Sequence, residues 1–110
     1  SKMKGNVLKW SKHKFASNVC ERACQYGSDS EREWIIIEMI TVIEQETSPP
    51  VQSMVKDQYA NYVVQKLLDI VNDRQKKTMV EAIKPIIPFV KKHTYSKHIV
   101  ARVEAYDDVK

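Results

Sequence analysis

The sequence predicts an all-α protein, built as an α-solenoid in which helical repeats stack along one direction. Three observations lead to this prediction. Apolar and β-branched residues recur at helical spacing, with no strand-like alternation; glycine is rare, with 2 in 110 residues; and one ten-residue motif occurs three times. A repeated helix pair that cannot bury its own apolar face stacks on its neighbour, which gives a solenoid.

The three copies of the motif begin at His13, Asp57 and His93, which gives spacings of 44 and then 36 residues. Each copy follows a lysine, has an aromatic residue third, a small residue fourth and a branched apolar residue seventh, and closes on a basic residue. The matching sets are Lys12, Lys56 and Lys92; Phe15, Tyr59 and Tyr95; Ala16, Ala60 and Ser96; Val19, Val63 and Ile99; and Arg22, Lys66 and Arg102. Agreement at so many fixed places indicates a true internal repeat.

Further helices are expected between the copies. The first should begin at a Ser or Asp N-cap, carry acidic residues in its first turn and run to about Glu46. A break follows at T-S-P-P, residues 47–50, because proline cannot continue a helix. The segment V-Q-S-M-V-K should then form a short helical turn.

After the second copy, a helix should be capped by Asn72 or Asp73 and run to about Lys84, followed by a short helix punctuated by prolines. Each unit is therefore a helix pair of about 36 residues, and the longer spacing places an inserted loop at 47–53. The expected division is 1–27 as the end of one repeat, 28–72 as a full repeat, and 73–110 as a closing unit.

The second copy, taken as a helix, has two distinct faces. One is an apolar stripe formed by Val63, Val64, Leu67, Leu68 and Val71. The other is a polar line at spacings of four residues, formed by Asn61, Gln65 and Asp69, with Tyr62 beside it. The same places hold Ser17, Glu21 and Gln25 beside Asn18 in the first copy, and Lys97, Ala101 and Ala105 beside His98 in the third. Such a line is either a solvated face free to vary or a surface that reads a planar ligand.

Composition bounds the function without choosing it. The chain is 43% hydrophobic and 29% charged with a net charge of +4, which is typical of a folded, mildly basic protein that is compatible with nucleic acid. No apolar segment follows the basic start, and the apolar run from Trp34 is interrupted by Glu38 and too short to cross a bilayer. We expect no membrane partner and a cytoplasmic location.

Cys20 and Cys24 lie one helical turn apart. A disulfide within a helical turn has poor geometry, and the three histidines do not complete a zinc site at the usual spacing. We expect two buried free thiols, which suggest a reducing compartment, and no cofactor or metal. No catalytic triad, paired carboxylate or glycine-rich phosphate loop is present, so the chain is not expected to be an enzyme.

The motif copies resemble a known family. S-N-V-C-E and N-Y-V-V-Q, in the contexts K-F-A-S-N and Q-Y-A-N-Y, resemble the last two repeats of the Pumilio (PUF) RNA-binding proteins. T-Y-S-K-H-I-V-A-R resembles the C-terminal capping pseudo-repeat of that family. The resemblance covers nearly the whole chain. It implies sequence-specific binding of single-stranded RNA in mRNA 3′ untranslated regions, for translational repression or mRNA decay.

In that family each repeat reads one base through two residues one turn apart, and the residue after the first of them stacks on bases. The resemblance implies that Ser17 and Glu21 contact the edge of guanine while Asn18 stacks. It likewise implies that Asn61 and Gln65 contact the edge of uracil while Tyr62 stacks. RNA runs antiparallel to the protein in this family, so the expected dinucleotide is 5′-U-G-3′, the start of a U-G-U-A element.

The third copy departs from this pattern, because Lys97 and Ala101 cannot select a base. We expect it to close the solenoid, with His98 either stacking on RNA or simply exposed. The basic residues beside the reading line either contact phosphates or are ordinary surface charges; they are Arg22, Lys66 and Arg102.

The T-S-P-P loop offers an alternative function. In the Pumilio family the loop between the last two repeats can dock regulatory proteins. The alternative to RNA reading is therefore a protein-interaction solenoid that binds partners through the 47–53 loop, with contacts from Thr47, Ser48, Pro49 and Pro50.

Overall fold

The computed structural model describes residues 5–42 and 46–109, and within them it contains helices and no strands. Eight α-helices and two single 3₁₀ turns follow one another along these residues. They are α1 Val7–Ser11, α2 Ala16–Tyr26, α3 Asp29–Ile40, α4 Pro50–Val55, α5 Ala60–Ile70, α6 Asp73–Ile83, η1 Lys84–Ile86, α7 Ile87–Val90, η2 Thr94–Ser96 and α8 Lys97–Val109. The prediction of an all-α fold is confirmed.

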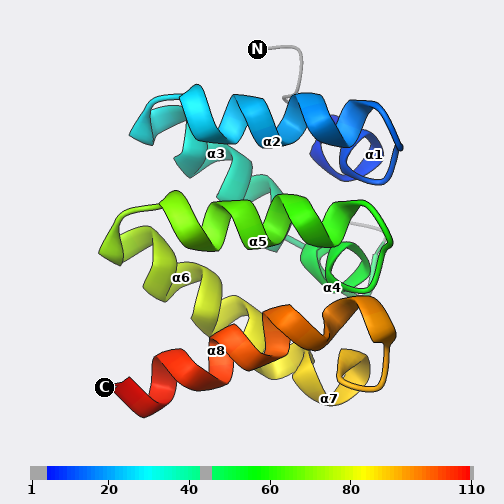
Figure 1. The fold of residues 1–110 in the computed structure, drawn as a ribbon, viewed down its shortest axis with the longest axis vertical. Helices are drawn as coiled ribbons and strands as arrows, with labels where there is room; N and C mark the ends of the chain where they lie inside the picture. Colours follow the sequence, from blue (N-terminus) through cyan, green and yellow to red (C-terminus); the bar gives the residue numbers. More distant parts are fainter. Residues whose placement is uncertain (1–4, 43–45, 110) are drawn as a thin grey trace.

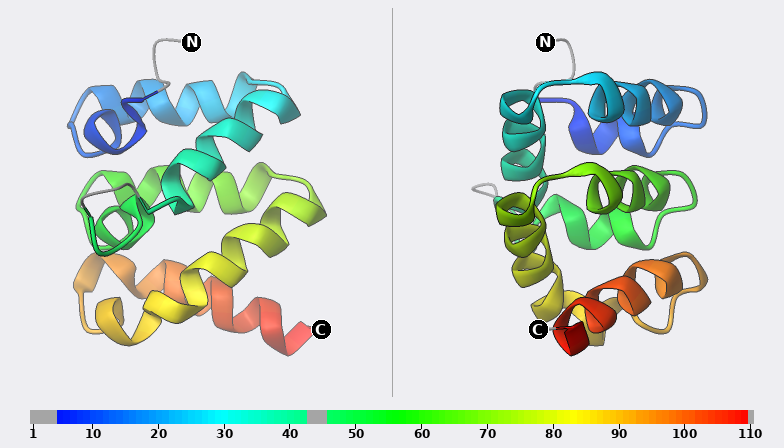
Figure 2. Two further views of the ribbon diagram at one scale, coloured as in Figure 1. Left: turned by 180° about the vertical axis from the view of Figure 1, so that it is seen from behind. Right: turned by 60° about the vertical axis from the view of Figure 1, so that its left-hand side comes forward.

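The helices form a stack of repeats with two layers. Helices α2, α5 and α8 lie one below the other in one layer, and α3 and α6 cross behind them in the second layer (Figures 1 and 2). The short helices α1, α4 and α7 lie at one edge, each followed by a turn into the long helix of the first layer. Because most of each motif copy lies in α2, α5 or α8, the three copies lie side by side.

Helices α3 and α6, which form the second layer, each begin at a reciprocal cap. The Ser28 hydroxyl accepts a hydrogen bond from the Glu31 backbone N–H at 3.1 Å, and the Glu31 carboxylate accepts from the Ser28 N–H at 3.2 Å. Asn72 and Gln75 repeat the same exchange at the start of α6. These capping boxes satisfy backbone donors that a helix N-terminus otherwise leaves unpaired, and they confirm the predicted starts of both helices.

The first residue of each of the first two motif copies is also a cap. Oδ2 of Asp57 accepts hydrogen bonds of 2.9 Å from the backbone N–H groups of Tyr59 and Ala60. His13 does the same through Nδ1, which accepts from Phe15 and Ala16 at 3.2 Å. His13 and Asp57 thus cap the starts of α2 and α5 in the same way, because each side chain carries an acceptor within reach of the first backbone N–H groups of the helix.

The core lies between the two layers and between successive repeats. Four residues of the predicted stripe on α5 are buried, namely Val63, Val64, Leu67 and Leu68. The fifth, Val71, is only half-buried, because α5 ends at Ile70 and Val71 has extended backbone angles. Val19 is also an exception: its counterparts Val63 and Ile99 are fully buried, but it is 54% exposed, because no described segment covers that side of α2.

Cys20 and Cys24 are buried free thiols, as predicted. Both lie on the side of α2 that faces the core. Burial disfavours the charged thiolate, so it raises the pKa of Cys24 to about 12 and also raises the pKa of Cys20. Neither thiol is therefore poised for redox or nucleophilic chemistry at neutral pH.

A buried amide joins α3 to α6, the second-layer helices of neighbouring repeats. Gln75 is 1% exposed. Its Nε2 donates to the backbone carbonyl of Asp29 at 3.0 Å and to Oε1 of Glu33 at 3.1 Å. Arg74 pairs with the same carboxylate oxygen at 2.8 Å. These contacts hold the first turn of α6 against the first turns of α3.

Two predicted boundaries differ from the structure. The helix expected to reach about Glu46 ends at Ile40, and Thr41 already has extended angles. Met39 is its last buried residue, and the β-branched Thr41 and Val42 that follow are exposed and favour helix less. Residues 43–45 lie outside the described residues.

The second difference concerns the loop expected at 47–53. Helix α4 begins at Pro50, so residues 51–53 are helical. Proline is favoured at the first position of a helix, where its missing N–H is not needed and its φ angle is suitable.

Among the described residues, no helix is long and apolar enough to cross a membrane.

Candidate nucleic-acid interface

The polar line on α5 is held by hydrogen bonds within the helix. Nδ2 of Asn61 donates to the backbone carbonyl of Asp57 at 2.7 Å, and Oδ1 of Asn61 accepts from Nε2 of Gln65 at 2.9 Å. Asn61 is only 2% exposed, whereas Gln65 is half-buried. The Gln65 amide therefore keeps its Oε1 acceptor and a second N–H donor for a ligand, and Asn61 restricts its orientation.

The matching place on α2 carries a hydroxyl and a carboxylate. Ser17 is 4% exposed, and its Oγ donates to the backbone carbonyl of Lys14 at 3.2 Å. Glu21, one turn later, is half-buried. Within the described residues Glu21 makes no hydrogen bond or ion pair, so both of its oxygens are available as acceptors.

A hollow of about 260 Å³ lies beside Glu21, between α2 and α5. The structure here brings together side chains that the sequence singled out from two different repeats. The hollow is lined by Asn18, Glu21, Arg22, Gln25 and Lys66. A carboxylate with two flanking cations next to a concave space can accept from a polar ring edge and attract a negatively charged backbone at the same time.

The residues expected to stack are all exposed. Tyr62 presents 54% of its surface to solvent one residue after the buried Asn61. Asn18 is exposed beside Ser17, and His98 is exposed near the start of α8. A planar side chain beside an edge-reading pair can meet the face of a base whose edge the pair contacts.

The three basic residues that close the motif copies differ in their surroundings. Arg22 is exposed and Lys66 half-buried, and neither has an ion-pair partner in the described part of the chain. Arg102, in contrast, is engaged by the preceding repeat. Its guanidinium pairs with the carboxylate of Asp69 and donates to the backbone carbonyl of Gln65 at 3.0 Å.

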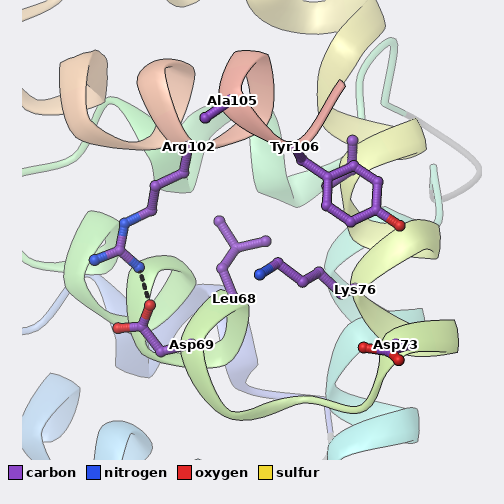
Figure 3. A pocket seen from close by; sticks show the side chains of 8 residues that line it. Leu68, Asp69, Asp73, Lys76, Arg102, Ala105 and Tyr106 are labelled. Carbon is purple, nitrogen blue, oxygen red and sulfur yellow. Dashed lines mark hydrogen bonds and ion pairs between the residues drawn. The ribbon is translucent and has the colours of Figure 1, made fainter. Parts of the chain in front are cut away.

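Figure 3 shows this ion pair at the edge of a second hollow, of about 430 Å³, where α5, α6 and α8 meet. The Lys76 ammonium points into the hollow and lies 5.9 Å from the ring centre of Tyr106, which forms one wall. The sequence interpretation missed this group. The 44-residue spacing between the first two motif copies could have identified Lys76, because it aligns Lys76 with Arg32. Arg32 holds the same place one repeat earlier, where it donates hydrogen bonds to the carbonyls of Cys24 and Gln25.

The remaining predicted residues lie on α8 and at or before the start of α4. Lys97 and Ala101 are exposed on α8 and present no polar pair. Thr47 is exposed before α4, while Ser48, Pro49 and Pro50 are half-buried. Among the described residues, no group of histidine, cysteine and acidic side chains could hold a metal ion.

Both halves of the chain are similar to known proteins of one family. A profile of the Pumilio-family RNA binding repeat matches residues 6–40 and 51–84. The mRNA-binding protein PUF3 of Saccharomyces cerevisiae is 42% identical over 84 residues, which cover 72% of this chain and 10% of that protein. A Pumilio domain-containing protein of Schizosaccharomyces pombe is 31% identical over 99 residues, covering 90% of this chain and 12% of that protein. The chain thus spans about a tenth of the length of these relatives.

Solved structures agree with the sequence comparison. The crystal structure of PUF-8 in complex with PBE-RNA superposes with a TM-score of 0.86 at 34% identity, covering 96% of this chain and 30% of that one. The Puf3 RNA binding domain bound to the Cox17 RNA 3′ UTR recognition sequence site B gives a TM-score of 0.76 at 34% identity, covering 93% and 32%. The stacked helix repeats predicted from the sequence are confirmed, and the family is one of sequence-specific RNA-binding repeats that are not catalytic. This chain belongs to the Pumilio family of RNA-binding repeats.

Proposed function

We propose that this chain is the C-terminal part of a Pumilio homology domain and reads 5′-U-G-3′ in single-stranded RNA. In this proposal 1–27 is the end of one repeat, 28–72 is a full repeat and 73–110 is the capping pseudo-repeat. The capping role is supported by the absence of a polar edge pair at Lys97 and Ala101, both of which are exposed.

The uracil is assigned to α5. The Watson–Crick edge of uracil alternates carbonyl acceptors with one N–H donor, so a reader must both accept and donate. Gln65 retains an acceptor and a donor after its bond to Asn61 at 2.9 Å. The buried Asn61 supports the assignment because it limits the rotation of the Gln65 amide, which lowers the entropy lost on binding.

The guanine is assigned to α2, and the observation that carries the proposal is the unpaired carboxylate of Glu21 in the inter-repeat hollow. Guanine presents two neighbouring donors, N1–H and N2–H, to a single carboxylate. No other standard base offers that pair of donors, so a carboxylate here selects guanine. The buried Ser17 hydroxyl supports the assignment, because its oxygen lone pairs can accept from the same base.

Stacking and phosphate contacts complete the proposed site. Tyr62 stacks on the bases next to it, as Asn18 does in the other repeat. Arg22 and Lys66 line or border the same hollow and have no competing ion pair in the described part of the chain, so we assign phosphate contacts to them. Arg102 contributes there only if its pair with Asp69 opens, and a stacking role for His98 is supported only by its exposure.

The biological role we propose is cytoplasmic repression or decay of mRNAs through their 3′ untranslated regions. Its support is the family membership and the description of a similar structure as bound to a 3′ UTR sequence. The unpaired thiols are consistent with a reducing compartment.

A test by NMR suits the weak affinity expected of a site with only two reading repeats. Amide shifts would be followed while a 5′-U-G-U-A RNA or a 5′-U-C-U-A RNA is added at low salt. We expect larger shifts in α2 and α5 for the guanine-containing RNA, and loss of this preference in the isosteric variant Glu21→Gln. Equal shifts with both RNAs in the unsubstituted chain would contradict base reading and indicate charge-driven binding.

A second role, docking of regulatory proteins at the inter-repeat loop, is supported by the exposure of Thr47, three residues before α4 begins. Because this loop lies on a different segment from the reading residues, a Thr47→Glu substitution should weaken such a partner without altering RNA shifts. An RNA preference that changes with Thr47→Glu would contradict an independent docking role.

A further inference from the structure

The turns that precede α2, α5 and α8 lie one below the other along a single edge of the stack (Figure 1). They comprise residues 12–15, 56–59 and 91–96, which we call the turn edge. The edge is distinct from the reading line, which runs across the middle of the same helices through Glu21 and Gln65. It is also distinct from the hollow shown in Figure 3, which lies toward the other ends of α5 and α8.

The turn edge carries the net charge of the whole chain. Of the 18 lysines and arginines, five lie in these three turns, while only one of the 14 acidic residues does. The remaining 13 basic and 13 acidic residues cancel. The five are Lys12, Lys14, Lys56, Lys91 and Lys92. Although the net charge of the whole chain is only mildly basic, the turn edge is therefore strongly basic.

The charges on this edge are not neutralised within the protein. The single acid, Asp57, is used as the cap of α5, where Oδ2 accepts two backbone hydrogen bonds of 2.9 Å. None of the five lysines forms an ion pair in the described residues, and four of them are exposed, Lys56 being half-buried. Since α2, α5 and α8 all begin at this edge, the partial positive charge of their N-termini adds to the field.

Aromatic rings are interleaved with these lysines. The third place of every motif copy is aromatic, and the rings of Phe15 and Tyr95 are 68% and 46% exposed, while Tyr59 between them is half-buried. The Lys14 ammonium lies 5.7 Å from the ring centre of Phe15. The turns thus place an aromatic ring, exposed in two of the three, near at least one lysine without an ion pair, which combines a stacking surface with a phosphate-binding charge.

We propose that the turn edge binds single-stranded RNA that flanks the read element, without regard to its sequence. This rests on the proposed function, because it extends the path of an RNA held on α2 and α5. The first residue of each of these helices follows directly on a turn-edge aromatic, so Phe15 and Tyr59 are each three residues from a stacking position, Asn18 and Tyr62. No acidic residue lies between the turn and Glu21 on α2, or between the turn and Gln65 on α5.

The chemistry favours RNA over an acidic protein segment. Lysine alone would serve any polyanion, but an aromatic ring repeated at every turn, and exposed at two of them, contributes most to a ligand that has flat faces along its length. Lysines contribute to the binding of nucleic acids by releasing counterions, about 0.7 per neutralised phosphate of a single strand. The edge therefore has a characteristic signature, which is an additional salt dependence, beyond that of the phosphate contacts at the reading site, that appears only when the RNA has flanks.

The experiment compares two RNAs and two double variants. One RNA is 5′-U-G-U-A alone, and the other carries flanks of about 8 adenines on each side, within the ~4–16 nucleotides typical of single-strand sites. The edge variant is Lys14→Gln with Lys92→Gln. The matched control is Lys9→Gln with Lys77→Gln, which removes two exposed lysines from α1 and α6. Thermal unfolding verifies that all variants are folded.

We expect the edge variant to weaken binding of the flanked RNA by roughly threefold to tenfold at low salt, and to reduce the slope of log K against log salt by about 1.4. Binding of the bare element should be unchanged, and the control variant should bind both RNAs as the unsubstituted chain does. Equal losses in the edge and control variants, or no loss in either, would overturn the proposal.

Two further outcomes separate this proposal from the reading of bases. If binding depends on the edge but replacing guanine by cytosine makes no difference, the reading proposal fails and the edge stands. If a polyglutamate peptide shifts the turn-edge amides while the adenine flanks do not, the edge serves an acidic protein segment and the RNA proposal is wrong.

Discussion

Gln65 donates a hydrogen bond from Nε2 to Oδ1 of Asn61, 2.9 Å away and one helical turn earlier on α5. Asn61 is itself fixed by a 2.7 Å bond to the backbone carbonyl of Asp57 and is almost completely buried. A buried amide therefore supports an accessible one. The two residues expected to read the same base differ in exposure, and their substitutions should have different consequences.

Substitution of Asn61 by alanine should affect both stability and reading. It removes the 2.7 Å side-chain bond to the Asp57 carbonyl, which keeps only the 3.3 Å bond from the backbone N–H at position 61. This loss costs about 0.5–1.5 kcal/mol, and it frees the Gln65 amide to rotate. We expect a lower midpoint in urea unfolding and a weaker preference for uracil. Gln65→Ala is the control: it should reduce the uracil preference while changing stability by only about 0.5 kcal/mol. A full uracil preference in folded Asn61→Ala would contradict the orienting role.

Substitution of Tyr62 by alanine should reduce RNA affinity by about 1–3 kcal/mol whichever base is offered, because stacking uses the face of a base. Since Tyr62 is 54% exposed, the unfolding midpoint should hardly change. Tyr62→Phe retains the ring and should bind as the unsubstituted chain does. Phe89→Ala removes an even more exposed ring on α7 and should leave affinity intact; a similar loss there would indicate a nonspecific effect.

Arg102 should act mainly as a tether between repeats. It joins α8 to α5 through Asp69 and the Gln65 carbonyl. Both partner side chains are substantially exposed, at 39% and 57%, so a double-mutant cycle of Arg102→Ala and Asp69→Ala should give a coupling of about 0.2–1 kcal/mol that falls with salt. In RNA binding, Arg22→Gln should cost more than Arg102→Gln, and the reverse order would assign Arg102 to the phosphates.

The stability of the α3–α6 contact should depend on acid pH. The hydrogen bond from Gln75, with further contributions from Arg74, holds the pKa of Glu33 below its ordinary value of 4.5. A carboxyl whose pKa is lower in the folded state stabilises the protein fully above the ordinary value and loses this contribution as pH falls through the folded value. The unfolding free energy should therefore decrease from about pH 5 toward about pH 3.

Glu33→Gln is the matched control for this pH dependence, because it retains a hydrogen-bond acceptor for Gln75 but does not titrate. Its unfolding free energy should fall less steeply over the same range than that of the unsubstituted chain. Parallel pH profiles of the two proteins would show that other carboxyl groups, rather than Glu33, cause the acid sensitivity.

Much of the fold was predictable because its signals are local. The caps at Ser28 and Asn72 and the break at Pro49 depend on residues a few positions apart, so the helices could be placed without a structure. The motif copies predicted which residues share a face, since helical spacing decides this. The hydroxyl, carboxylate and amides of the reading line were therefore recognisable as candidates.

Contacts between repeats were decided only by the tertiary structure. Arg102 and Asp69 are 33 residues apart, and no local signal distinguishes Arg102 from the unpaired Arg22 at the same motif place. Likewise, Val63 is buried and Val19 exposed although both hold the seventh place, because burial depends on what packs against a helix. The end of α3 at Ile40 has the same cause, because its last buried residue is Met39. Sequence determined the repeat and its candidate readers, while packing between repeats decided which side chains remain free to bind.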